Sequence, residues 1–532
     1  MGIRIVAASA AGLMAMGLVA AVPLTTPAQA TQGETARAFQ AKAVDWGPCK
    51  DQALKQAGAR CGMLEVPLDH ADPGGPTIQL AVSRVLHTRT PYRGVVFTNP
   101  GGPGGSGTYL ARIGQSVPGH VAETYDWYGI DPRGVGESKP ALACDGGYLG
   151  WDRPDYVPST SARTRYWRHK TEKYAQDCAD APAKRLLGHL RTTDNAADFD
   201  TLRQAVGADQ ITYYGFSYGT YLGQVYATLY PDRVQALILD GVIDPGRVFY
   251  RSNLDQDRAF QKSFEKFLAW IGKYPRVYHL GRGEKAVMRT YERLRAQLAR
   301  KPAAGGRIGP DELDDALLPG AYYNSYYAYV ASAFSALATK GDASGIKNLY
   351  GGPGGKGADN GYAIYLGTEC TDAPWPADWS TWQDDMWRVH KQAPFLTWPN
   401  AWFNAPCRTW PVAGQAPVDV SGAGLDAPVL LLSETHDPAT PYSGALAARR
   451  LFPSAALVAG VGGYSHAVSL SGIACTDDTI ANLLRDGSLP TRKSGNRADK
   501  ECRPVPPPNP TGGVAGSARV LPGRPLPPMM RW

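Results

Sequence analysis

The sequence predicts an α/β fold in which helices cover both faces of a mostly parallel sheet and a large helical cap is inserted into it. Short apolar, β-rich runs recur along the chain, and helical patterns separate them. Strands buried on both faces have this continuous apolar pattern because helices cover the sheet on each side. The strand pattern then stops between Leu239 and Pro428, where helical and aromatic sequence indicates the insertion.

Residues 1–30 have the pattern of an export signal. Arg4 provides a basic start, residues 5–22 are almost all apolar or small, and Ala28-Gln29-Ala30 is a small-x-small cleavage site. A membrane anchor is the alternative, but the break from Pro23 to Pro27 and the cleavage site favour export with removal, and no later segment is long and apolar enough to span a bilayer. We therefore expect a secreted, extracellular protein that loses its signal peptide and has no membrane partner afterwards. Residues 31–45 follow as a leader or propeptide.

The charge and the cysteines limit the kinds of partner. The formal net charge is +7, and it falls to +6 when Arg4 is removed with the signal. This mild, diffuse charge gives no argument for nucleic acid, and we expect a monomer. All eight cysteines lie in the exported part, where an even count predicts disulfides. Four sequential couples are the simplest of 105 pairings. The cysteines are Cys49, Cys61, Cys144, Cys178, Cys370, Cys407, Cys475 and Cys502. No C-x-x-C or H-x-x-x-H spacing occurs, so we expect no metal site.

We place the first part of the α/β core at residues 46–245. Its expected strands are Ile78–Val85, Gly94–Thr98, Tyr125–Ile130, Ile211–Tyr214 and Ala236–Leu239. Helical patterns at Asn195–Ala205 and Tyr218–Leu229 lie between them.

A glycine-rich segment, residues 99–107, directly follows the second of these strands. It contains a literal G-x-G-x-x-G at Gly102, Gly104 and Gly107, which suggests a dinucleotide site. However, two prolines disrupt the tight turn that such a site needs, and a diffusible cofactor is unsuited to an exported protein. We prefer an oxyanion loop, in which the backbone N–H of Gly101 or Gly102 acts together with that of Tyr218.

A second turn follows the next strand and reads Asp131-Pro-Arg-Gly-Val-Gly136. Asp131 and Arg133 could take part in chemistry. A buried, salt-linked turn that shapes the glycine loop is the preferred interpretation.

The most informative segment is Gly215-Phe-Ser-Tyr-Gly219. It lies between a β-prone run and a helical pattern, so Ser217 is placed at the sharp turn from strand to helix. Glycines at the flanking positions let neighbouring backbone pass close by, and the turn exposes the hydroxyl above the sheet. This context predicts that Ser217 is a nucleophile.

Residues 246–425 form the expected helical cap. Helical patterns occur at Leu254–Trp270, Glu284–Ala299, Asp311–Leu318 and Tyr327–Ala338. Aromatic side chains cluster here, and we expect most of them in the cap core and the rest around a substrate cleft. They are Tyr322, Tyr323, Tyr326, Tyr327, Trp375, Trp379, Trp382, Trp387, Trp398 and Trp402.

Residues 426–502 complete the core and supply the partners that a serine nucleophile needs. The expected strand Val429–Leu432 leads into a turn that offers two carboxylates, Glu434 and Asp437. We select Asp437, which lies in the Asp-Pro turn beyond the strand end. His466 follows in a glycine-flanked loop, and we prefer it as the base over His436, which adjoins the proposed acid. Residues 503–532 are a Pro/Gly-rich tail, expected to be disordered or to wrap around the molecule.

Taken together, these segments resemble the α/β-hydrolase superfamily and, within it, the secreted actinobacterial tripeptidyl aminopeptidases, relatives of the prolyl aminopeptidases. The resemblance covers about residues 45–502. It rests on residues 99–107, 131–136, 215–223, Glu369-Cys-Thr-Asp372 and Asp437-Pro-Ala-Thr-Pro441. It implies a serine exopeptidase that releases mainly tri- or tetrapeptides from free N-termini, with proline preferred before the scissile bond in some members. It also implies the same roles for Ser217, Asp437 and His466.

One departure from the family pattern lies in the base loop, where Ala467 follows the histidine and relatives often carry glycine. An aminopeptidase must also hold a protonated amine, and burying that cation requires a carboxylate. Glu369 is the first candidate and Asp372 the second; the alternative is a solvated acid beside a disulfide.

We therefore expect acyl transfer through Ser217 without metal or organic cofactor, acting on the N-termini of peptides or proteins. A secreted esterase or lipase is the nearest alternative, because the triad alone does not choose between ester and amide. A non-enzymatic binding protein on the same fold is the second alternative.

Overall fold

The computed structural model describes residues 39–351, 355 and 357–510. The signal segment and the end of the tail therefore lie outside the described residues. In the described part, ten strands form one sheet in the order β1-β2-β3-β5-β4-β6-β7-β8-β9-β10. The strands are β1 (Gly47–Pro48), β2 (Arg60–Pro67), β3 (Thr77–Val85), β4 (Gly94–Asn99), β5 (Tyr125–Ile130), β6 (Ile211–Phe216), β7 (Val234–Asp240), β8 (Val429–Glu434), β9 (Ala455–Gly460) and β10 (Lys500–Cys502).

The sheet confirms the predicted α/β fold. Strands β5, β4, β6, β7, β8, β9 and β10 pair in parallel, whereas β1, β2 and β3 add an antiparallel edge. The sequence pattern did not reveal β2. Gly62 and Glu65 interrupt its apolar run, and its side chains are only half-buried over much of its length. An antiparallel strand near the edge does not need the continuous apolar pattern of a central parallel strand.

Two layers of helices cover the sheet, and alternate strand residues face each layer. Val95 and Phe97 pack on one side with α3 (Thr192–Ala205) and α4 (Tyr218–Leu229), while Val96 packs on the other side with α16 (Ala474–Asp486). This alternation follows from the period of two in an extended chain. The core helices are α1 (Gln52–Gln56), α2 (Ser161–Asp180), α3 (Thr192–Ala205), α4 (Tyr218–Leu229), α15 (Tyr442–Leu451) and α16 (Ala474–Asp486).

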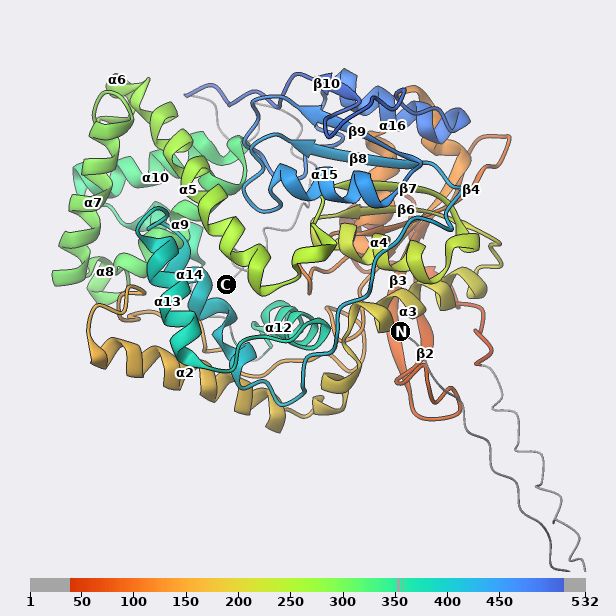
Figure 1. Ribbon diagram of the computed structural model, residues 1–532, viewed down its shortest axis with the longest axis horizontal. Coiled ribbons are helices and arrows are strands. Elements are labelled where there is room, and N and C mark those ends of the chain that lie inside the picture. The colour runs from red at the N-terminus through yellow and green to blue at the C-terminus, as the bar shows by residue number, and fades with distance from the viewer. Residues whose placement is uncertain (1–38, 352–354, 356, 511–532) are drawn as a thin grey trace, which may run out of the picture.

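A helical region separates β7 from β8 and extends to one side of the sheet (Figure 1). Between Asp240 and Val429, the described residues form no strand. Aromatic and aliphatic side chains give this region two apolar clusters, which include Phe264, Trp270 and Phe334 in one and Trp382, Trp398 and Trp402 in the other. The helices are α5 (Tyr250–Gly272), α6 (Pro275–Tyr278), α7 (Glu284–Arg300), α8 (Ala303–Gly306), α9 (Pro310–Tyr322), α10 (Tyr327–Lys340), α11 (Ser344–Tyr350), α12 (Asn360–Asp372), α13 (Trp379–His390) and α14 (Thr397–Asn404).

The eight cysteines form four disulfides between sequential pairs, as their spacing predicts. The pairs are Cys49–Cys61, Cys144–Cys178, Cys370–Cys407 and Cys475–Cys502. No helix in the described part of the chain is both long enough and apolar enough to cross a bilayer.

A buried ion pair fixes the turn after β5. Arg133 is fully buried, and its Nε and Nη2 donate to the two carboxylate oxygens of Asp198 on α3 at 2.8 and 2.7 Å. Its Nη1 donates to the carbonyl oxygens of Leu68 and His189. The turn is therefore salt-linked as expected, and the partner of Arg133 is Asp198. Burial alone would raise the pKa of Asp198, but the Arg133 guanidinium and hydrogen bonds hold that pKa below its ordinary value.

We expect Asp198→Asn to destabilise the protein by about 3–5 kcal/mol, because it leaves the Arg133 guanidinium buried without a counter-ion. Urea unfolding at pH 7 measures this change. Asp209→Asn, which alters an exposed carboxylate beyond the same helix, is the control and is expected to change stability by less than about 0.5 kcal/mol. Equal stability of the two variants would contradict the assignment.

Candidate active site

Ser217 lies at a strained turn between β6 and α4. Its φ and ψ are 55° and −126°, a conformation that costs a non-glycine residue about 1–3 kcal/mol. The Ser217 N–H donates to the Asp240 carbonyl at 2.9 Å, and the Thr220 N–H donates to the Ser217 carbonyl at 2.8 Å. A Cβ on Gly219 would lie 2.7 Å from Asn99 Oδ1, so the tight turn requires glycine there. The backbone thus holds Ser217 at the start of a helix, as the motif predicts.

Asp437 and His466 form a buried hydrogen-bonded pair. Asp437 lies three residues beyond β8, and His466 lies in the loop after β9. His466 Nδ1 is 2.9 Å from both Asp437 carboxylate oxygens. Asp437 also accepts the backbone N–H groups of Ala439 and Thr440 at 2.9 Å each. The carboxylate is therefore fixed on one side of the imidazole, which leaves Nε2 for a different partner.

A cavity of about 280 Å³ has both Ser217 and His466 in its lining. Its lining includes Ser217, His466, the glycine loop at Gly101, Gly102 and Gly105, and Glu369. Tyr322, Tyr323, Tyr365, Phe249 and Phe403 supply aromatic walls. The nucleophile candidate, the base candidate and the predicted amine anchor thus face one cavity between the sheet and the inserted helices.

The two rival residues have other contacts. Glu434 is fully buried and accepts the backbone N–H of Ser465 at 2.5 Å and that of Val505 at 2.9 Å. The His436 ring stacks on Tyr464 at a centroid distance of 4.5 Å and does not line the cavity just described. The geometry therefore favours Asp437 over Glu434 and His466 over His436.

The glycine loop offers two predicted N–H donors. The Gly101 N–H donates to Asn99 Oδ1 at 2.9 Å, which favours Gly102 of the two alternatives. Among the described residues, the backbone N–H groups of Gly102 and Tyr218 have no hydrogen-bond acceptor. These two N–H groups remain the candidates for an oxyanion hole.

Asp131 holds the far end of this loop. Its Oδ1 accepts from Ser106 Oγ at 2.7 Å and from the N–H groups of Gly107 and Thr108 at 2.8 and 3.1 Å. Its Oδ2 accepts the Glu137 N–H at 3.0 Å. Asp131 therefore shapes the glycine loop, as the sequence suggests, and does not line the cavity formed by the described residues.

The loop after His466 is held by Asp240, which sequence analysis missed. Asp240 ends β7 and accepts the N–H groups of Val468 and Ser469 at 3.2 and 2.7 Å. The sequence feature that could have indicated this role is an acidic residue at the end of a buried strand. Ala467 has a φ of 49°, a left-handed conformation that glycine adopts without strain. This explains physically why glycine suits the position after the histidine.

Glu369 is a buried acid with spare hydrogen-bonding capacity. It lies in α12, is 6% exposed, and its Oε2 has no hydrogen-bond partner in the described structure. Burial raises the pKa of Glu369 to about 8. A cation in the cavity would stabilise the ionised form.

Behind Glu369 lies a buried polar chain that no sequence motif indicated. Tyr365 donates to Asn404 Oδ1 at 2.8 Å, and Asn404 donates to the Asn400 carbonyl at 2.9 Å. Asn400 in turn donates to Asp257 Oδ1 at 2.9 Å. Burial raises the pKa of Asp257 to about 7. Helices α5, α12 and α14 are therefore linked around the candidate amine site.

Asp372, the second candidate anchor, lies outside the cavity lining given by the described residues. Its carboxylate accepts the Thr192 N–H at 2.7 Å and Thr192 Oγ1 at 2.5 Å, and Thr192 Oγ1 lies 2.6 Å from the Tyr218 hydroxyl. Burial raises the pKa of Asp372 to about 7. Asp372 thus connects α12 with the turn that bears Ser217, and its position favours Glu369 as the amine ligand.

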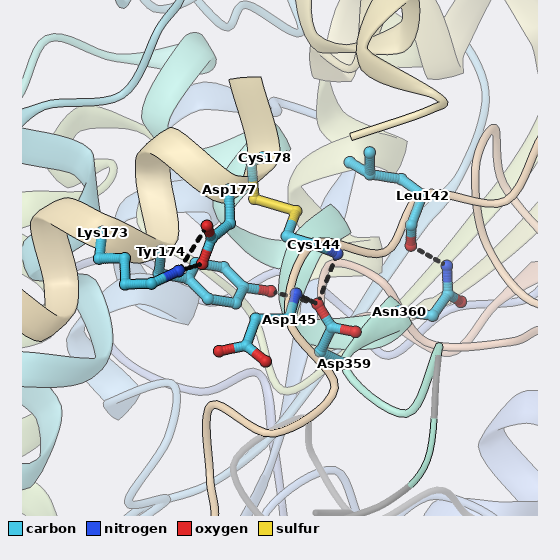
Figure 2. The surroundings of a disulfide bond; sticks show 9 residues. All are labelled: Leu142, Cys144, Asp145, Lys173, Tyr174, Asp177, Cys178, Asp359 and Asn360. Atoms are coloured by element: carbon cyan, nitrogen blue, oxygen red, sulfur yellow. Dashed lines mark hydrogen bonds and ion pairs between the residues drawn. A yellow bond between two sulfur atoms is a disulfide. The ribbon is translucent and has the colours of Figure 1, made fainter. Parts of the chain in front are cut away.

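The N-terminal end of α12 is also held by hydrogen bonds to neighbouring segments (Figure 2). Asp359 Oδ2 accepts the N–H groups of Cys144 and Asp145 and the Tyr174 hydroxyl at 2.7–2.8 Å. The Cys144–Cys178 disulfide ties this segment to α2. Asn360 donates to the carbonyls of Gly134 and Leu142 at 2.7 and 2.6 Å. Both ends of the helix that carries Glu369 are therefore fixed to the α/β core.

Comparison with known proteins defines the class. Residues 94–472 match the α/β hydrolase fold family, and the chain belongs to this family. It is 38% identical over 489 residues to a tripeptidyl aminopeptidase of Streptomyces coelicolor, covering 89% of this chain and 88% of that protein. The chain is therefore a hydrolase and a homologue of tripeptidyl aminopeptidases.

Two relatives with lower sequence identity have names other than tripeptidyl aminopeptidase. The serine protease Hip1 of Mycobacterium tuberculosis is 31% identical over 84% of this chain and 89% of that protein. Carboxylesterase B of the same organism is 32% identical over 90% of this chain and 96% of that protein.

Within the described residues, no group of three or more His, Cys, Asp or Glu side chains is arranged to hold a metal ion.

We expect Glu369→Gln to stabilise the protein at pH 8 and to change its stability little at pH 4.5. Because folding raises the pKa of Glu369 from about 4.5 to about 8, the folded state binds an extra proton between these values and loses stability as the pH rises. Glutamine removes this loss. Thermal unfolding at both pH values tests the prediction.

The control is Glu292→Gln, which alters an exposed glutamate on α7. Its melting temperature should follow that of the parent protein at both pH values. A Glu369→Gln variant that gains no stability at pH 8 would show that the Glu369 carboxylate is not buried without a counter-ion.

Proposed function

We propose that the protein is a secreted serine exopeptidase that releases tri- or tetrapeptides from free N-termini of peptides and proteins. The observation that carries the proposal is the buried Glu369 carboxylate, which faces the same cavity as Ser217 and has an oxygen without a partner in the described structure. A buried carboxylate without a counter-ion is unfavourable. The protonated α-amine of a peptide supplies the missing cation.

The proposed chemistry assigns one role to each member of the triad. His466 Nε2 takes the proton from the Ser217 hydroxyl as Ser217 Oγ bonds to the carbonyl carbon. Asp437 keeps the proton on Nδ1 and stabilises the imidazolium. The N–H groups of Gly102 and Tyr218 stabilise the oxyanion. His466 then protonates the leaving amine, the C–N bond breaks, and water activated by His466 hydrolyses the acyl-enzyme.

The length of α12 gives a scale for the proposed site, measured from the glycine loop and not from Ser217. Gly104 of the glycine loop touches the start of α12, where an added Cβ would overlap the Gly361 carbonyl oxygen. Glu369 lies eight residues after Gly361, about 12 Å along the helix axis at about 1.5 Å per residue. An extended peptide advances about 3.3 Å per residue, so three or four residues span about 10–13 Å.

We also propose that a proline residue is preferred immediately before the cleaved bond.

Export is proposed from residues 1–30 together with the four disulfides, since disulfides persist in oxidising compartments. The substrates are then peptides outside the cell, and nucleic acid and membrane partners are not part of the proposal. We propose a monomer with a helical cap at residues 246–425, between core parts at 46–245 and 426–502.

Ester hydrolysis is the second candidate, because one relative is named carboxylesterase B and a serine triad acts on esters as well as amides. The two functions differ in what Glu369 contributes. An esterase has no need of a buried carboxylate that binds a substrate amine.

The proposal predicts that Glu369→Gln lowers kcat/KM for free tripeptide anilides by about 30- to 1000-fold, because a buried charge partner is lost. Hydrolysis of p-nitrophenyl acetate, which has no amine, should remain within about threefold. Chromogenic di-, tri- and tetrapeptides with free and acetylated N-termini measure both effects. If the parent enzyme cleaves acetylated and free peptides equally well, the amine-anchor assignment fails.

A matched pair of histidine variants tests the base. His466→Ala should lower kcat by at least about 10⁴-fold, since Ser217 loses its proton acceptor. His436→Ala should retain kcat within a few-fold, because its ring stacks on Tyr464 away from the cavity. Steady-state kinetics on one tripeptide anilide measures both variants. Comparable losses in the two would contradict the assignment of His466.

A further inference from the structure

Residues 503–510 lie against both the α/β core and the inserted helices, next to the His466 loop. Val505 is buried, and its N–H donates to Glu434 Oε1 at 2.9 Å. Its carbonyl accepts from Asn324 Nδ2 at 2.7 Å, just after α9. Farther along, the Pro510 carbonyl accepts the Tyr278 hydroxyl at 2.8 Å. Part of the sequence predicted as a tail is thus hydrogen-bonded at both of its ends.

The same Glu434 and Asn324 also hold the residue before the candidate base. Glu434 Oε2 accepts the Ser465 N–H at 2.5 Å, so each of its carboxylate oxygens serves a different segment. The Asn324 N–H donates to Ser465 Oγ at 3.3 Å. One residue later, the His466 N–H donates to the Tyr322 carbonyl at 3.0 Å.

These bonds form a closed buried circuit in which Glu434, Val505, Asn324 and Ser465 each contact two of the others. Glu434, Asn324 and Ser465 are 0–5% exposed, and Val505 is 6% exposed. Inside a protein, a lost partner leaves the remaining polar group unsatisfied, so the members of such a circuit are strongly coupled. A Cβ on Gly463 would overlap the Glu434 carboxylate, which shows how closely the base loop fits around it.

We propose that Glu434 and the backbone of Val505 are positioning groups that hold His466 in register with Ser217, so that the C-terminal segment supports catalysis. The inference rests on the proposed role of His466 as the base. It gives Glu434 a function that differs from the rival role of catalytic acid. It also makes the inserted helices and the C-terminal segment joint supports of one loop.

The most direct test compares two substitutions at Val505. V505P removes the N–H that Glu434 accepts, and the extended conformation expected before Pro506 can accommodate proline. V505A keeps the N–H and removes only apolar contacts, so it controls for lost stability. Glu434→Gln is an independent variant, because an amide offers one acceptor oxygen to two N–H donors.

The readout is the rate at which a fluorophosphonate labels Ser217, normalised to the number of sites labelled at the endpoint, followed by kcat and KM on a tripeptide anilide. Normalisation counts only folded enzyme, so loss of folding does not mimic loss of positioning. We expect V505P and Glu434→Gln to label about 10- to 100-fold more slowly, with kcat lowered and KM within about twofold. V505A should stay within about threefold of the parent rate.

Equal normalised rates for V505P, V505A and the parent protein would overturn the inference, as would a rise in KM with kcat unchanged. The outcomes remain separate from those of the proposed function. A parent protein that is not labelled at Ser217 refutes the serine mechanism itself. A labelled parent that does not cleave peptides refutes the exopeptidase proposal but leaves the positioning test valid.

Discussion

The active site depends on one constraint, the fixed position of helix α12 relative to the α/β core. Its first turn contacts the glycine loop, and Asp359 and Asn360 bind the segments near Cys144 and Gly134. At its other end, Asp372 reaches the turn of Ser217 through Thr192. Glu369 lies between these anchors, and in the proposed function its position relative to Ser217 selects the length of the peptide.

Residues with unfavourable local energies gather around the same cavity. Ser217 and Ala467 have left-handed φ angles, and Glu369 is a buried acid with a raised pKa. Such strain persists only where the surrounding structure over-determines it. Here the support comes from the Arg133–Asp198 pair, the disulfides and the hydrogen bonds of Asp131 and Asp240. These supporting residues lie outside the cavity lining of the described structure, whereas Ser217, Ala467 and Glu369 line it.

The local motifs were readable from sequence because each acts within a few residues. The turn at Ser217, the glycine loop and the Asp-Pro turn at Asp437 combine residue types whose backbone requirements are specific. The α/β fold followed from the apolar strands. The roles of Asp372 and Asn400 were not readable, because their partners Thr192 and Asp257 lie 180 and 143 residues away in the chain. The sequence left Gly101 and Gly102 as alternatives, and only the three-dimensional structure shows that the Gly101 N–H donates to the Asn99 side chain.

The central claim is that a buried carboxylate selects free N-termini and that α12 sets the length released. Mass spectrometry of the first products from a 15-residue peptide tests both parts together, with the same peptide acetylated at its N-terminus as the comparison. The account predicts that tri- or tetrapeptides appear first from the free peptide and that the acetylated peptide stays intact. Internal cleavage of both peptides at similar rates, or release of single amino acids, would contradict it.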